Sequence, residues 1–68
     1  MLVPQIWEDV LVEYHLNKAN AWHRTLQLEK LDDWAREFAQ AELNYALLML
    51  SALGKHAVLR DDIYQLEE

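Results

Sequence analysis

The chain has 68 residues with one Gly, one Pro and no Cys, and its 12 acidic and 6 basic side chains give a net charge of −6 at pH 7. This length allows one small domain, residues 1–68, and the lack of cysteine excludes disulfides, thiolate metal sites and a cysteine nucleophile. So few turn-forming residues argue against a β-sandwich, and 53% apolar residues are too many for a disordered chain, so the composition predicts an all-α fold, a small helical bundle.

The first predicted helix covers residues 4 to about 16. Pro4 suits the first turn of a helix because its ring fixes φ near the helical value. Glu8 and Asp9 follow near the positive end of the helix dipole, where carboxylates are stabilising. No Gly or Pro occurs between Pro4 and Gly54. One helix of that length would measure about 70 Å, so a compact fold requires a break.

Two segments contain residues suited to that break. Asn17–Asn20 has two asparagines, which tolerate left-handed conformations and cap helices, and Glu29–Asp33 has two aspartates that suit an N-cap. Apolar residues recur at helical spacing directly across the second segment. The periodicity therefore favours a break near Asn17–Asn20 and a long second helix over residues 20 to about 53. The alternative is a hairpin of two nearly equal helices that turns at Lys30–Asp33.

The end of the second helix is marked by Gly54, a residue suited to the position after a helix because it adopts positive φ freely. In the C-terminal segment, residues 55–68, Asp62 is followed three residues later by Gln65. This spacing matches a capping box, which is typical of a helix N-terminus. The sequence therefore predicts a short C-terminal helix.

The segment from Ala41 to Leu53 is apolar on nearly every side of a helix. A helix of this kind is buried all round, and burial of each Leu is worth roughly 1.5–3 kcal/mol. A short first helix and a C-terminal tail are too small to cover it. We therefore expect oligomerisation to complete the bundle, most simply as a homodimer. The predicted oligomer interface consists of Leu43, Tyr45, Leu47, Met49, Leu50 and Leu53.

Three tryptophans are many for a chain of this length. Tryptophan fills cores, and at surfaces it anchors binding interfaces. Trp22 lies one position off the apolar stripe, beside His23 and Arg24, where a purely structural helix is expected to be polar. These three residues are the candidate partner-binding site.

No motif for catalysis or cofactor binding stands out. The single Gly excludes Gly-rich phosphate loops and the Gly-x-Ser-x-Gly motif. Neither His15 nor His23 has a carboxylate or a second histidine at helical spacing, so no metal site is predicted within one helix. The rival interpretation is a metal-binding bundle enzyme with ligands from neighbouring subunits.

Acidic residues form a short row at helical spacing, Glu29, Asp33 and Glu37. Basic residues interrupt this row, and Asp32 has the spacing of an ion pair with Arg36. The pattern is typical of a solvated face. The alternative is a nucleic-acid mimic that occupies a basic cleft on another protein, with strongly salt-dependent binding.

The negative charge opposes binding to phosphate backbones and to anionic membranes. The N-terminus lacks the basic residues of a signal peptide, and the longest nearly uncharged run, Leu43 to Gly54, is shorter than the roughly 20 residues that span a bilayer. We therefore expect a cytoplasmic, non-catalytic protein–protein interaction module of the adaptor, assembly-factor, chaperone or inhibitor type. It would bind itself and an unidentified protein, without a cofactor, nucleic acid or membrane.

Overall fold

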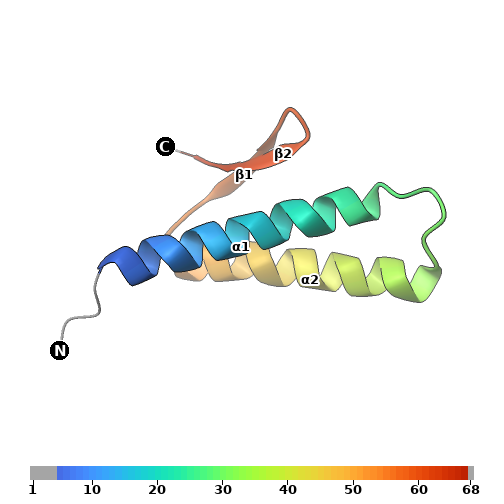
Figure 1. Cartoon of the computed structure of the whole chain (residues 1–68), viewed down its shortest axis with the longest axis horizontal. Coiled ribbons are helices and arrows are strands. Elements are labelled where there is room, and N and C mark those ends of the chain that lie inside the picture. Colours follow the sequence, from blue (N-terminus) through green and yellow to red (C-terminus); the bar gives the residue numbers. More distant parts are fainter. Residues whose placement is uncertain (1–4, 68) are drawn as a thin grey trace.

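The computed structural model describes residues 5–67, except the side chains of residues 5 and 6. Two helices, α1 (Gln5–Leu26) and α2 (Asp33–Ala52), precede two short strands, β1 (Ala57–Arg60) and β2 (Ile63–Leu66). The helices run antiparallel side by side, and the strand pair lies over one side of them (Figure 1). The fold is therefore mostly helical, and the prediction of a purely α fold is wrong.

The predicted break at Asn17–Asn20 is also wrong, because α1 continues through it to Leu26. The residues of α1 that face α2 form a stripe that includes neither Asn17 nor Asn20. Three of its members are buried, and the stripe runs unbroken through Val12, His15, Ala19, Trp22 and Leu26. The predicted helices over residues 4–16 and 20–53 thus differ from the two observed helices, which are of similar length. Pro4, the predicted first-turn residue, lies outside the described residues.

The chain reverses between the two helices, so the alternative hairpin of two nearly equal helices is confirmed, although its turn covers residues 27–32 rather than Lys30–Asp33. Neither Gly nor Pro makes this turn. Instead, the Arg36 guanidinium donates hydrogen bonds to the carbonyl oxygens of Leu26 (3.0 Å) and Leu28 (3.3 Å). Within residues 5–67 Arg36 forms no ion pair with Asp32, contrary to the expectation from their spacing. A side chain of α2 thus satisfies one carbonyl at the end of α1 and one in the turn.

The end of α2 agrees with the sequence. Gly54 has a φ of 78°, and its N–H donates to the carbonyl of Ser51 at 2.9 Å. The N–H of Lys55 donates to the carbonyl of Leu50, also at 2.9 Å. This pair of bonds is the Schellman motif, in which a glycine ends the helix because it takes a left-handed conformation without strain.

The C-terminal segment forms an antiparallel strand pair, so the predicted C-terminal helix is wrong. Arg60 pairs with Ile63, which leaves Asp61 and Asp62 as a two-residue turn. Both aspartates have positive φ, 53° and 65°, as a type I′ turn requires, and the twist of this turn matches that of paired strands. Asp62 thus serves as a turn residue, and the spacing to Gln65 has no role in capping.

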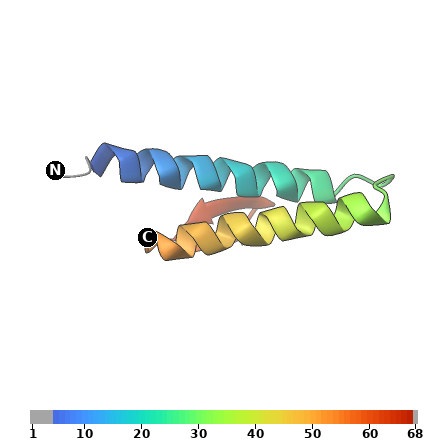
Figure 2. The ribbon, with the colours of Figure 1, turned by 90° about the horizontal axis from the view of Figure 1, so that it is seen from below.

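The core is small and lies where the two helices and β2 meet. Three of its buried apolar residues are alanines, which let the helices approach closely; the buried apolar residues are Val12, Ala19, Ala39, Leu43, Ala46 and Leu50. The Cα atoms extend over 47 × 25 × 14 Å, so the helical pair is a single layer. Figure 2 views the molecule from the side opposite the strands, where no described element covers the helices. One side of the layer is therefore partly covered and the other is open.

Candidate interaction surface

The open side of the helical pair carries a continuous set of large side chains, which we call the open face. Residues spaced three or four apart share one side of a helix. One such series on each helix runs along the side of the helical pair that is opposite the strands. The open face consists of Trp7, Leu11, Tyr14, Lys18 and Trp22 of α1 and Trp34, Phe38, Glu42, Tyr45 and Met49 of α2.

Aromatic contacts join the two helices across this face. The rings of Trp22 and Phe38 meet edge to face, with centroids 5.6 Å apart, a favourable geometry for aromatic pairs. Further along, the ammonium of Lys18 lies 5.5 Å from the centroid of the Tyr14 ring. Tyr14, Lys18 and Trp22 of α1 and Tyr45 of α2 border a hollow of about 100 Å³ between the helices. The open face is thus contoured rather than flat.

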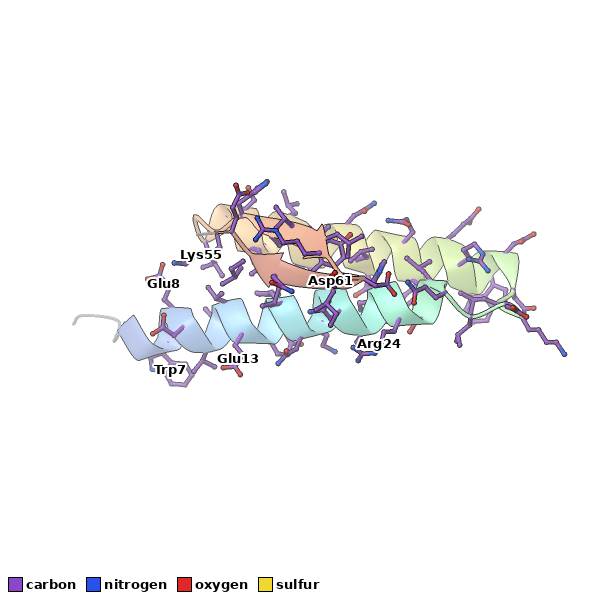
Figure 3. The ribbon with its side chains drawn as sticks, turned by 90° about the horizontal axis from the view of Figure 1, so that it is seen from above. Trp7, Glu8, Glu13, Arg24, Lys55 and Asp61 are labelled. Atoms are coloured by element: carbon purple, nitrogen blue, oxygen red, sulfur yellow. The ribbon has the colours of Figure 1, made fainter. Side chains whose placement is uncertain are left out.

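Six of these side chains remain 44–71% exposed: Trp7, Leu11, Tyr14, Trp34, Phe38 and Tyr45. Figure 3, viewed from the strand side, shows Trp7 pointing away from α2. Because a whole aromatic side chain offers about 150–250 Å² and Leu11 adds a smaller area, these six expose roughly 700 Å² together. Exposed apolar side chains of this total area are typical of an interaction site.

The opposite side of the helical pair, which the strands cover, is called the hairpin face. There the side-chain amide of Asn20 fixes the strand pair to α1. Its Oδ1 accepts the backbone N–H of Tyr64 at 2.6 Å, and its Nδ2 donates to the carbonyl of Tyr64 at 3.0 Å. The amide thereby pairs with β2 as a neighbouring strand would. An asparagine that resembles a helix breaker in the sequence in fact docks the strand pair on α1.

A second set of bonds fixes the turn of the strand pair to α1. The carboxylate of Asp62 accepts hydrogen bonds from Nε2 of His23 (2.9 Å) and from Nε2 of Gln27 (2.7 and 2.9 Å). These bonds, first that of His23 and then that of Gln27, hold the pKa of Asp62 below its ordinary value. The ring of His23 also meets that of Tyr64 edge to face, with centroids 5.4 Å apart.

The predicted interface residues do not share one surface. Leu43 and Leu50 are buried inside the single chain, with 4% and 0% of their surface exposed. Leu47 packs against the core and borders a groove at the start of β1, on the hairpin face. Only Tyr45 and Met49 lie on the open face, because α1 is long enough to cover the leucines itself. Leu53 lies at the C-cap of α2 and is partly buried.

The candidate partner-binding residues point in three directions. Trp22 packs on the core and on Phe38 at the open face. His23 bonds to Asp62 on the hairpin face, and Arg24 is exposed on the outer side of α1 (Figure 3). The structure thus does not bring Trp22, His23 and Arg24 together into one site.

The predicted acidic row is split, because Glu29 lies in the turn whereas Asp33 and Glu37 belong to α2. In the part of the chain that the structure describes, no group of three or more His, Asp or Glu side chains is placed to hold a metal ion. Neither described helix is long and apolar enough to cross a membrane. No protein family, curated protein or solved structure matches the chain.

Sequence reasoning missed most of the open face, although a signal was present. Trp7, Leu11 and Tyr14 recur at helical spacing before Trp22, and Phe38 precedes Tyr45 by two turns of α2. The hydrogen bonds of Asn20 and Asp62 join positions 44 and 39 residues apart. No local sequence pattern predicts hydrogen bonds between positions so far apart.

Proposed function

We propose that this chain is an acidic protein–protein interaction module that acts by binding rather than catalysis, as a two-fold dimer paired through its open faces. The observation that carries the proposal is the uncovered, aromatic-rich side of a single helical layer. Domains are built from at least two packed layers, and here the strands cover only one side of the helices. A second copy supplies the missing layer and yields a four-helix bundle.

The size and charge of the open face fit a second copy of the chain. Its roughly 700 Å² of exposed apolar surface is close to the 800 Å² or so that each partner buries in a standard interface. Although the chain carries a net charge of −6, this face has one Lys and one Glu. Its burial therefore brings no excess of like charge together.

The two ends of the face both carry large side chains. Trp34 and Phe38 lie at the turn end, while Trp7 and Leu11 lie at the opposite end, because the helices are antiparallel. A two-fold axis through the middle of the face places the turn end of each copy against Trp7 and Leu11 of the other. Such isologous pairing is the commonest form of oligomer.

Light scattering after size exclusion, over a dilution series, tests this arrangement. We expect twice the 8.1 kDa chain mass and a monomer for Tyr45→Glu. Leu48→Glu is the matched control, because Leu48 is similarly exposed (65% against 55%) but lies outside the open face. A monomeric wild-type protein at high concentration, or dissociation by Leu48→Glu alone, would contradict the proposal.

A further inference from the structure

The outer edge of β1 has unpaired backbone groups. The N–H of Glu67 donates to the carbonyl of His56 at 2.7 Å, so residues 56 and 67 form a hydrogen-bonded pair. Because hydrogen-bonded and non-hydrogen-bonded pairs alternate in an antiparallel ladder, Ala57 and Leu59 belong to non-hydrogen-bonded pairs. Their N–H and C=O groups therefore point away from β2, toward the free edge.

Among the residues that the structure describes, the outward backbone groups are hydrogen-bonded at one edge of the strand pair and free at the other. On β2, the N–H and C=O of Tyr64 point outward in the same way, and the amide of Asn20 occupies both. On β1, no described side chain bonds to Ala57 or Leu59. The edge near α1 is thus closed by an amide, whereas the edge near α2 is available to a peptide backbone.

A groove lies beside this free edge. It has a volume of about 440 Å³ and is bordered by Leu47, Leu48 and Ser51 of α2 and by the start of β1. Leu59 lies directly opposite Tyr64 in the strand pair, so their side chains are on the same face of the sheet. Tyr64 packs against the core, whereas Leu59 stays 48% exposed. Apolar side chains of a strand added to β1 would rest in this groove, against Leu48 and Leu59.

Two basic side chains lie near the groove in an otherwise acidic chain. Lys55 borders the groove and Arg60 ends β1, while the carboxylate of Glu67 lies 3.5 Å from His56. Within residues 5–67 neither Lys55 nor Arg60 forms an ion pair. We propose that the edge of β1 and this groove bind an extended segment of a partner protein in which apolar and acidic residues alternate, by addition of a third strand to β1. This site is independent of the open face and remains available in the proposed dimer.

Fluorescence anisotropy with a short labelled peptide of alternating Val and Glu tests strand addition. Leu59→Pro removes an outward N–H without removing a bond of the β1–β2 ladder. We expect Leu59→Pro to weaken binding about fivefold, the usual effect of one lost hydrogen bond. Leu59→Val keeps the N–H and should bind like the wild type. Equal binding by both variants would overturn the proposal, as would no saturable binding to the wild type.

A charge exchange tests the chemistry of the occupant and does not depend on proline. Lys55→Glu should weaken binding of the acidic peptide, whereas Lys30→Glu, in the exposed turn between the helices, should leave it unchanged. A peptide of alternating Val and Lys should bind the wild type much more weakly. Equal binding of both peptides, or equal loss in both variants, would refute an acidic occupant. Light scattering separates this outcome from failure of the proposed dimer, because Tyr45→Glu should abolish dimers and retain peptide binding.

Discussion

Replacing Asn20 by Ala should loosen the strand pair from α1 without unfolding the helices. The change removes two hydrogen bonds, to the N–H and to the carbonyl of Tyr64. At about 0.5–1.5 kcal/mol each, their loss costs roughly 1–3 kcal/mol. Ala is the better helix former, which returns up to about 0.7 kcal/mol. The free energy of unfolding should therefore fall by roughly 0.5–2.5 kcal/mol, a large part of the roughly 3–10 kcal/mol expected for a chain of this length.

Asn17→Ala is the matched control because the same chemical change then occurs at an exposed position of the same helix. That variant gains only helix propensity, so it should be slightly more stable than the wild type. Urea unfolding followed by circular dichroism, at one fixed protein concentration, measures the difference, which should be roughly 1–3 kcal/mol. Amide exchange at Tyr64 should speed up in Asn20→Ala alone. Equal urea midpoints for the two variants would refute the docking role of Asn20.

Two further predictions concern the core and the turn of the strand pair. Leu50→Ala should destabilise the chain by about 2–5 kcal/mol because Leu50 is fully buried, while Leu48→Ala, at an exposed position, should cost far less; similar midpoints in urea would contradict this assignment of the core. The pKa of Asp62 lies below its unfolded value of 3.8, so its contribution to stability is present above about pH 4 and is lost as the pH falls through the folded pKa. Asp62→Asn should remove this part of the acid dependence of unfolding and Asp61→Asn should retain it, and an identical acid profile for both variants would argue against the hydrogen-bonded role of Asp62.

The helical content and the glycine stop at Gly54 could be predicted because they depend on neighbours in sequence. The position of the reversal could not, because two apolar stripes compete. One runs from Leu28 across the turn, and the other, from Val12 to Leu26, ends at it. The second stripe prevails because it packs against α2, and Arg36 bonds to the carbonyls left free at the turn. Local spacing alone does not rank the two.

The strand pair could not be predicted from the sequence for a different reason. Asp62 and Gln65 satisfy a local helix signature, but Asp62 gains more from the distant donors His23 and Gln27. For the interaction surface, the error followed from the misplaced break. With α1 cut short, Leu43 and Leu50 were expected to need a partner, whereas the full-length helix buries them. The open aromatic face becomes visible once both helices have their observed bounds.

The pairing of Asn20 with the main chain of Tyr64 distributes evolutionary constraint unevenly between the two positions. Since the amide recognises only the N–H and C=O of residue 64, any residue except proline there retains both bonds. At position 20, by contrast, few side chains present a donor and an acceptor in this geometry. Divergent homologues should therefore keep an asparagine at position 20 while exchanging apolar and aromatic residues at position 64.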